Sequence, residues 1–136
     1  MARWWGRYDA DKVRRDLAES PCFAIVIDGA VQGWLQVYEE TDREYRHVAL
    51  DIALATEAHG HGYGPEALRL AIRHYIERGH HRFSIDPARH NERAIRAYSK
   101  LGFKPVGVLR DYERLDGQDA WHDSLLMDLL AGEFEG

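Results

Sequence analysis

The segment HGHGYGPEALRLAI, residues 59–72, combines residue types that bind phosphate groups. Gly60, Gly62 and Gly64 stand at every second position, and an apolar pattern with helical spacing follows them. Backbone N–H groups at the start of a helix attract anions, and a glycine lets a phosphate approach without a Cβ atom in the way. We therefore expect this loop to hold the pyrophosphate of a nucleotide-containing ligand.

Two other interpretations of this loop stay open. Gly62, Gly64 and Ala67 also fit the G-x-G-x-x-A pattern of dinucleotide-binding folds, and Asp86 follows at about the required 20 residues. That fold needs repeated strand–helix units, whereas a hairpin pattern precedes this loop and only one strand–helix–strand unit follows it. In the second interpretation, the glycines only form a tight turn.

The alternating segment over residues 45–54 carries one carboxylate that could act on an amine. Val48, Leu50, Ile52 and Leu54 share one face of this strand. Asp51 lies on the other face between Ala49 and Ala53, whose small side chains leave room for a ligand. Asp51 is therefore a candidate to bind or deprotonate an amine, and a plain salt bridge or an exposed position is the alternative.

The eight histidines raise the question of a metal site, above all at His59 and His61 and at the adjacent pair His80 and His81. No carboxylate or cysteine completes a ligand set at a recognisable spacing. The sequence therefore predicts no metal.

The elements that must position these residues follow from hydrophobic periodicity. Helical spacing predicts helices over residues 9–20, 65–78 and 91–101. Runs rich in β-branched and aromatic residues predict strands over residues 22–27, 31–38, 45–54, 82–86, 103–109 and 122–130. The dipeptide Asp28-Gly29 predicts that the first two strands form a hairpin.

Length and composition limit the class of protein. With 136 residues, 45% of them hydrophobic, and no linker-like stretch, residues 1–136 are expected to form a single domain. No apolar run reaches the roughly 18 residues that cross a bilayer, and the N-terminus lacks a signal-peptide pattern, so we expect a cytoplasmic protein without a membrane partner. The net charge of −5 argues against a nucleic-acid partner. The sequence leaves open whether the chain forms a homodimer.

Two motifs, in this order and at this spacing, resemble the signature of the GCN5-related N-acetyltransferases (GNAT), which use acetyl-CoA. The family's loop pattern Arg/Gln-x-x-Gly-x-Gly/Ala falls on residues 59–64, with His59 where the family has Arg or Gln. The second pattern, Asn-x-x-Ala-x-x-x-Tyr-x-x-x-Gly-Phe, falls on Asn91, Ala94, Tyr98, Gly102 and Phe103. The resemblance implies an α/β GNAT fold, a mixed and mostly antiparallel sheet with flanking helices, here without the family's first strand and first helix.

The resemblance also implies acetyl-CoA as co-substrate and a role for each matching residue. The residues expected to bind it are Ile52, Ala53, Leu54, His59, Gly60, His61, Gly62, Tyr63, Gly64, Asn91 and Ala94. Backbone amides near Ile52 and Leu54 are expected to hold the pantetheine arm like an added strand. Tyr98 is expected to protonate the departing thiolate, whereas without the motif it would be an ordinary core aromatic.

Further segments, GWLQVY, WWG and DPARHNERAIRAYSKLGF, are similar to aminoglycoside 6′-N-acetyltransferases. Trp34, Gln36 and Tyr38 share a strand face that suits a sugar hydroxyl or an amine, although an ordinary solvated face fits the pattern equally well. Asp86 could hold a second amine of the substrate or cap the next turn. We therefore expect an N-acetyltransferase that acts on a primary amine of a small, aminoglycoside-like polyamine. The alternatives are a protein N-terminal or lysine acetyltransferase and a truncated, non-catalytic acyl-CoA-binding domain.

Overall fold

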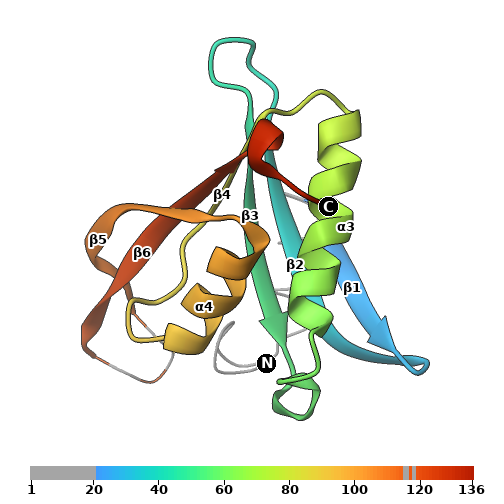
Figure 1. The fold of residues 1–136 in the computed structure, drawn as a ribbon. Coiled ribbons are helices and arrows are strands. Elements are labelled where there is room, and N and C mark those ends of the chain that lie inside the picture. The colour runs from blue at the N-terminus through green and yellow to red at the C-terminus, as the bar shows by residue number, and fades with distance from the viewer. Residues whose placement is uncertain (1–20, 115–116, 118) are drawn as a thin grey trace.

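A six-stranded sheet and two α-helices form the part of the chain that the computed structural model describes, residues 21–114, 117 and 119–136 (Figure 1). The strands are β1 (Cys22–Ile27), β2 (Ala30–Glu40), β3 (His47–Leu54), β4 (Arg82–Ile85), β5 (Lys104–Arg114) and β6 (Trp121–Leu130). The α-helices are α3 (Tyr63–Glu77) and α4 (Glu92–Leu101), and short 3-10 helices cover Thr56–Ala58 and Ala131–Glu133. The predicted order of elements is thus confirmed from β1 onward, whereas the predicted helix over residues 9–20 lies outside the described residues.

The strand order of the sheet is β1-β2-β3-β4-β6-β5. β3 and β4 run parallel, and the other neighbouring strands run antiparallel. The sheet is therefore mixed and mostly antiparallel, as the sequence predicts. It is not the doubly wound parallel sheet that the dinucleotide-binding interpretation of the glycine loop requires.

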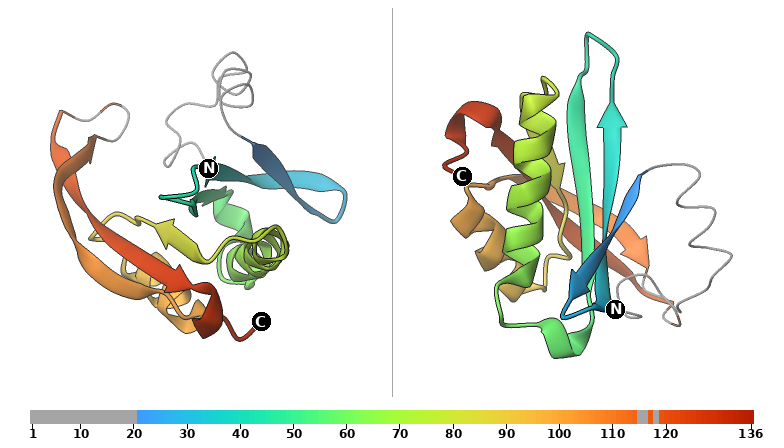
Figure 2. Two further views of the ribbon diagram at one scale, coloured as in Figure 1. Left: turned by 90° about the horizontal axis from the view of Figure 1, so that it is seen from above. Right: turned by 90° about the vertical axis from the view of Figure 1, so that its right-hand side faces the viewer.

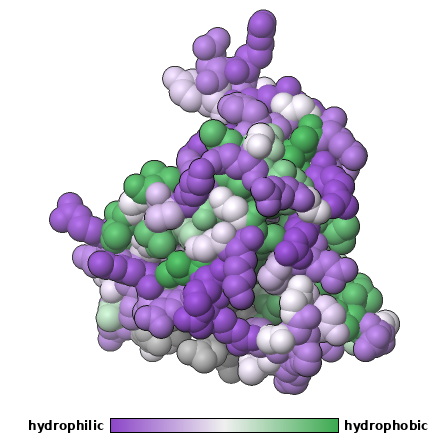
Figure 3. Space-filling view, viewed as in Figure 1, coloured by the Kyte–Doolittle hydropathy of each residue, from purple (hydrophilic) through white to green (hydrophobic). Residues whose placement is uncertain are grey.

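Both α-helices cover the same face of the sheet (Figure 2). The apolar stripe of α3, with Leu68 and Ile72 fully buried, packs on strand residues that alternate toward the helices. In β2 this alternation buries Leu35 and Val37. The outer surface of the helix-bearing side is mostly polar, and hydrophobic side chains gather at its margin over β5 (Figure 3). No helix in the described part of the chain is long and apolar enough to cross a membrane.

The sheet opens between β3 and β4, and this opening positions the site. β2 pairs with β3 as far as Leu54, whereas β4 pairs with β3 only at Val48 and Ala49. Beyond β4 the chain stays beside β6, because the Leu125 N–H donates to the Pro87 carbonyl at 2.9 Å. Residues 50–54 of β3 consequently have no strand on the β4 side among the described residues, and Figure 1 shows the two strands diverging.

The structure corrects several predicted boundaries, two of them near the site. α3 begins at Tyr63 rather than at Pro65, so the proline is the third helical residue. Proline fits there because the N–H groups of the first helical turn have no intrahelical acceptor. β5 continues to Arg114 instead of ending near residue 109, with irregular pairing on β6 between Leu109 and Glu113. The sequence pattern hides this extension because the irregularity breaks the alternation of faces.

Candidate active site

The glycine loop enters α3 with an open, left-handed backbone. Gly60 and Gly62 have φ angles of 81° and 78°, and Gly62 is the N-cap of α3. A Cβ atom built on Gly62 would meet nothing within 4 Å, so the space in front of this position is open. Backbone donors at the start of a helix and an open approach are what the predicted phosphate-binding loop needs. The contact of Gly60, His61, Gly62 and Tyr63 with a phosphate stays a prediction.

Gly64 serves a different purpose from the other two loop glycines. It is buried, and a Cβ atom at this position would lie 3.4 Å from Leu54 Cδ1 and 4.0 Å from Ile52 Cδ1. These are ordinary van der Waals distances, so the start of α3 packs against the end of β3 at this glycine. This packing places the start of α3 beside the strand segment that has no partner on the β4 side.

Two polar side chains, His59 and Arg93, lie beside the loop. His59 Nε2 lies 3.0 Å from the Leu54 carbonyl oxygen, so this side chain turns back onto the end of β3. Arg93 Nη2 lies 3.4 Å from the position that a Cβ atom of Gly60 would take. Arg93 was not among the predicted residues, and only the packing of α4 against the loop reveals it.

Asn91 has a structural role at the start of α4. Its Oδ1 accepts a hydrogen bond from the Ala94 N–H at 3.3 Å, which makes Asn91 the N-cap of this helix. The contact of Asn91 and Ala94 with acetyl-CoA stays a prediction.

The sheet face opposite the helices brings the predicted acceptor residues together. In the β2–β3 pair, Gln36 lies opposite Asp51, Trp34 opposite Ala53, and Tyr38 opposite Ala49. Directly opposite residues of antiparallel strands share a face, so these side chains form one surface. Tyr38 is the most exposed of them, with 66% of its area accessible.

Tyr98 lies on α4 in the core, and its ring packs edge-on against Phe103 at a centroid distance of 6.3 Å. Burial raises the pKa of the Tyr98 hydroxyl far above its usual range, and the charges of Asp51 and Asp86 raise it further. The hydroxyl is therefore protonated at neutral pH and lies within electrostatic reach of two carboxylates. The core position and the predicted role as proton donor are compatible.

Asp86 meets two residues that the sequence did not predict. The Tyr112 hydroxyl donates a hydrogen bond to Asp86 Oδ2 at 3.2 Å. Burial raises the pKa of the Asp86 carboxyl, and the Tyr112 hydrogen bond offsets part of that rise. Burial also raises the pKa of Glu113, and the negative charge of Asp86 adds to this rise. The charges of Asp51 and Asp86 thus act on the hydroxyls of both Tyr98 and Tyr112, and the charge of Glu113 acts on that of Tyr112.

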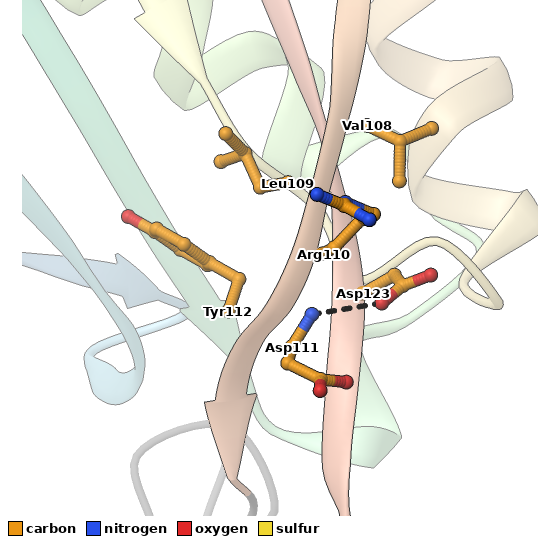
Figure 4. A pocket seen from close by; sticks show the side chains of 6 residues that line it. All are labelled: Val108, Leu109, Arg110, Asp111, Tyr112 and Asp123. Atoms are coloured by element: carbon orange, nitrogen blue, oxygen red, sulfur yellow. Dashed lines mark hydrogen bonds between the residues drawn. The ribbon is translucent and has the colours of Figure 1, made fainter.

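An open pocket with a volume of about 720 Å³ lies at the irregular part of β5 (Figure 4). Its lining residues are Val108, Leu109, Arg110, Asp111, Tyr112 and Asp123. Tyr112 projects to one side of β5, while Asp111 and Asp123 meet on the other (Figure 4).

The histidine pairs do not form metal sites among the described residues, where no group of three or more His, Cys, Asp or Glu side chains could hold an ion. His80 is buried, and its Nε2 lies 2.6 Å from Glu39 Oε2. The His61 ring lies 5.7 Å from that of Tyr63.

A comparison with known protein families identifies the family of this chain. The model of the family described as the acetyltransferase (GNAT) family matches residues 2–103. The chain belongs to the GNAT family. Its mixed sheet, its glycine loop before α3 and its diverging central strands are therefore those of a GNAT domain.

Individual relatives of this GNAT domain include enzymes that act on ribosomal proteins. It is 35% identical to the [ribosomal protein uS5]-alanine N-acetyltransferase of Escherichia coli (strain K12) over 86 residues, which make up 62% of this chain and 43% of that protein. The alignment thus spans less than half the length of this relative.

Solved structures share the fold over most of the chain. Mycobacterium smegmatis RimJ in complex with CoA-disulfide superposes with a TM-score of 0.79 and 25% identity, covering 93% of this chain and 61% of that one. The ribosomal-protein-alanine N-acetyltransferase from Brucella melitensis superposes with a TM-score of 0.78 and 22% identity, covering 96% and 84% of the two chains. The first of these structures contains a coenzyme A derivative, and the second shows the shared fold.

Proposed function

We propose that this GNAT domain is an acetyl-CoA-dependent N-acetyltransferase whose acceptor is the α-amino group of a protein N-terminus. The opening between β3 and β4 is the observation that carries the proposal. Among the described residues it leaves residues 50–54 without strand pairing on the β4 side, between the glycine loop at the start of α3 and the carboxylates around Asp86. A thioester carrier on one side and an amine on the other could meet at this edge.

The residues around the edge fit acetyl-CoA, which supplies the thioester and its acetyl group when bound. The left-handed Gly60 and Gly62 present backbone N–H groups to a pyrophosphate, and Arg93 adds a positive charge beside Gly60. His59 turns back to the Leu54 carbonyl, whereas the Arg93 guanidinium lies beside Gly60, so Arg93 is the candidate cation for the phosphates. The backbone of residues 52–54 is available to pair with an extended arm as an added strand.

The carboxylates and phenols supply the proton transfers that amide formation needs. An amine must lose a proton as its nitrogen bonds to the acetyl carbon, and the departing sulfur must gain one as its bond breaks. Asp51 and Glu113 are the candidate acceptors of the amine proton. The raised pKa of Glu113 makes its carboxylate a stronger base than an ordinary glutamate. Tyr98 is the candidate donor of the proton to the sulfur, because its hydroxyl is protonated at neutral pH.

The comparisons favour a protein N-terminus over the aminoglycoside-like acceptor that the sequence first suggested. The Escherichia coli and Brucella melitensis relatives are named as alanine N-acetyltransferases of ribosomal proteins. The negative charges of Asp51, Asp86 and Glu113 also suit the positive charge of an α-ammonium group before it loses its proton. The aminoglycoside-like polyamine therefore becomes the second candidate, supported only by Trp34, Gln36 and Tyr38 on the sheet face opposite the helices.

A matched acceptor panel tests the proposal by release of free thiol from acetyl-CoA. One arm is a peptide beginning with alanine and free of lysine. The second is the same peptide with a blocked N-terminus, the third is the blocked peptide with one added lysine, and the fourth is an aminoglycoside. We expect turnover with the free α-amine alone. Turnover restricted to the lysine peptide or to the aminoglycoside would overturn the choice of acceptor, and binding of acetyl-CoA without any transfer would favour a non-catalytic domain.

A further inference from the structure

β5 leaves regular pairing where it passes the carboxylates. Leu109 lies opposite Ser124 and Glu113 lies opposite His122, so β5 advances four residues while β6 advances two. The extra residues form a bulge at Arg110, Asp111 and Tyr112. Bulges change the direction in which the following side chains point, and they are common next to active sites.

The bulge depends on an unusual backbone conformation at Asp111. Its φ angle is 47°, in the left-handed region that residues other than glycine rarely adopt, although aspartate tolerates it better than most. Such a conformation is energetically unfavourable for a residue with a side chain and persists only where surrounding contacts hold it. At this position the contact comes from β6.

Asp123 on β6 contacts both the bulge of β5 and the loop that connects β4 to α4. Its Oδ1 accepts a hydrogen bond from the Asp111 N–H at 2.9 Å, drawn in Figure 4. Its Oδ2 lies 3.5 Å from Arg89 Nη1, in the loop that connects β4 to α4. The Arg89 N–H in turn donates to the Asp123 carbonyl at 2.9 Å. One residue thus ties the bulge of β5 to the loop that begins at Asp86.

The bulge has a direct consequence for the candidate active site. Tyr112 is the next residue after Asp111, it projects to the opposite side of β5 from Asp123, and its hydroxyl reaches Asp86 (Figure 4). Glu113 follows and returns to pairing with β6 within the field of Asp86. A regular strand over these residues would rotate Tyr112 and Glu113 to other positions relative to Asp86.

We propose that Asp123 is a positioning residue for the acceptor side of the reaction: by holding the left-handed Asp111, it aims Tyr112 at Asp86 and brings Glu113 to the same carboxylate. This inference rests on the proposed function. Asp123 touches neither reacting group, and it acts through the backbone of β5. Its loss should therefore weaken use of the acceptor amine and leave acetyl-CoA binding at the glycine loop intact.

The chain offers a closely matched control on the same strand. Asp128 of β6 pairs with Arg82 at 3.4 Å, and its side chain is 28% exposed, against 33% for Asp123. The two carboxylates thus have similar ion pairs and similar exposure, but only Asp123 holds a left-handed residue. Exposed ion pairs contribute little by themselves, so Asp128→Ala isolates that small contribution.

Steady-state kinetics with the α-amine peptide test the inference. We expect Asp123→Ala to lower kcat/KM for the peptide by about 30-fold or more, since small displacements of positioned groups have effects of this size, with the Kd of acetyl-CoA within about twofold. Asp123→Asn keeps an oxygen acceptor for the Asp111 N–H, so we expect a loss of no more than about threefold. Asp128→Ala should match the wild type. Adding Asp111→Gly to Asp123→Ala should restore most of the activity, because glycine adopts the left-handed conformation without help.

Amide hydrogen exchange at Asp111 tests the inference independently of turnover. We expect faster exchange in Asp123→Ala than in the wild type, Asp123→Asn and Asp128→Ala. If the wild type transfers no acetyl group, the proposed function fails, while this comparison still decides whether Asp123 holds the bulge.

Equal exchange in all variants, equal kinetic losses in Asp123→Ala and Asp128→Ala, or no rescue by Asp111→Gly would overturn the inference. If Asp123→Ala does not fold, Asp123→Asn combined with Arg89→Met must keep near-wild-type activity, because the N–H acceptor remains; a large loss would assign the role to the ion pair instead.

Discussion

At the scale of single residues, the candidate site holds more carboxylates than one proton transfer needs. Asp51 belongs to the β3 face with Gln36, while Glu113 belongs to β5 and lies in the field of Asp86. Both affect Tyr112, because the charges of Asp51 and Glu113 raise the pKa of its hydroxyl, whereas Asp51 also raises the pKa of Tyr98. Binding the ammonium group and accepting its proton are therefore separable tasks that two residues can share.

Replacing each carboxylate by its amide separates these tasks. We expect Glu113→Gln to lower kcat by about 100-fold, the scale of a lost general base, and to remove the acidic limb of the pH–rate profile. We expect Asp51→Asn to act mainly on KM for the amine, because an amide no longer attracts the ammonium charge. Acetyl-CoA affinity should stay unchanged in both variants. The reverse result, with the large loss of kcat in Asp51→Asn, would assign the base to Asp51, and loss of acetyl-CoA binding would make either residue structural.

Tyr98 tests the other proton transfer. We expect Tyr98→Phe to lower kcat by about 10-fold or more with little change in KM for acetyl-CoA, because only the hydroxyl is removed and the ring still fills the core. Thermal unfolding is the control for packing, and the melting temperature should change little. Unchanged turnover in a folded variant would limit Tyr98 to its core position beside Phe103.

The contact between the buried His80 and the part-buried Glu39 predicts how stability depends on pH. The hydrogen bond from His80 Nε2 and the nearby Arg78 hold the pKa of Glu39 below its usual value of 4.5. A carboxyl whose pKa is lowered in the folded state stabilises the protein above its unfolded pKa and loses that contribution as the pH falls through the folded value. The Glu39 contribution should therefore be complete near neutral pH and disappear below pH 4.5.

Urea unfolding of Glu39→Gln measures this contribution, because glutamine keeps an acceptor for His80 and removes the titration. We expect the variant to be less stable by about 1–2 kcal/mol at neutral pH, with the difference from the wild type shrinking as the pH falls below 4.5. Glu40→Gln, at the next residue of β2, is the control. A difference that does not depend on pH would show that the charge of Glu39 adds nothing to stability.

At the scale of elements, the glycine loop and the pairing of β2 with the end of β3 shape the region where the cofactor is expected to lie. Gly62 caps α3 in the left-handed conformation with open space in front of it. Gly33 lies opposite Leu54, and a Cβ atom there would come within 2.4 Å of the Ala53 carbonyl oxygen. The first glycine is therefore expected to serve binding, while the second allows β2 and β3 to approach each other.

Gly62→Ala tests the loop. We expect the Kd of acetyl-CoA to rise by about 10-fold or more, because the new methyl group occupies the space of a phosphate oxygen. Gly29→Ala is the matched control: its φ angle of 80° imposes the same backbone strain, and its surroundings are equally open, but it lies in the β1–β2 turn. Calorimetric titration gives both values, and equal affinities in the two variants would reduce the loop to a turn.

Gly33→Ala tests the approach of the two strands. Because its closest neighbour is backbone, the strands must separate at this point, and we expect a loss of about 1–3 kcal/mol in the free energy of unfolding. Gly107→Ala on β5, where a Cβ atom would meet nothing within 4 Å, should change stability much less. Similar losses in both variants would mean that strand propensity, and not the close approach, determines the effect.

At the scale of the whole molecule, the opening between β3 and β4 divides the sheet into two arms that share one core. β1, β2 and β3 form one arm with α3, and β4, β6 and β5 form the other with α4 (Figure 2). In the described part of the chain, strand pairing joins the arms only at Val48 and Ala49 of β3. A ligand that pairs with the free edge of β3 would therefore replace the missing strand and link both arms.

Hydrogen exchange with and without acetyl-CoA tests this arrangement. We expect added protection in residues 50–54 and 60–64, because backbone N–H groups there gain partners, and no change in residues 22–32 of the first hairpin. The melting temperature should rise as well, since a ligand that binds only the folded state stabilises it. Protection of the β5–β6 arm alone would place the ligand elsewhere and contradict the proposed cofactor site.

The sequence alone determined the features that depend on local periodicity. Alternation along residues 45–54 placed Asp51 on the face opposite the core, and the same rule placed Trp34, Gln36 and Tyr38, so the side of the sheet could be predicted before the strands were paired. Helical spacing after the glycines predicted α3 to within two residues of its start.

Only the tertiary structure decided which of these residues meet. Arg93 beside Gly60, Tyr112 on Asp86 and Glu113 near the same carboxylate depend on contacts between elements that lie far apart along the chain. The bulge of β5 shows the reason most clearly. Its left-handed Asp111 is held by Asp123, 12 residues away on the neighbouring strand, so no local pattern of hydrophobicity or turn propensity encodes it.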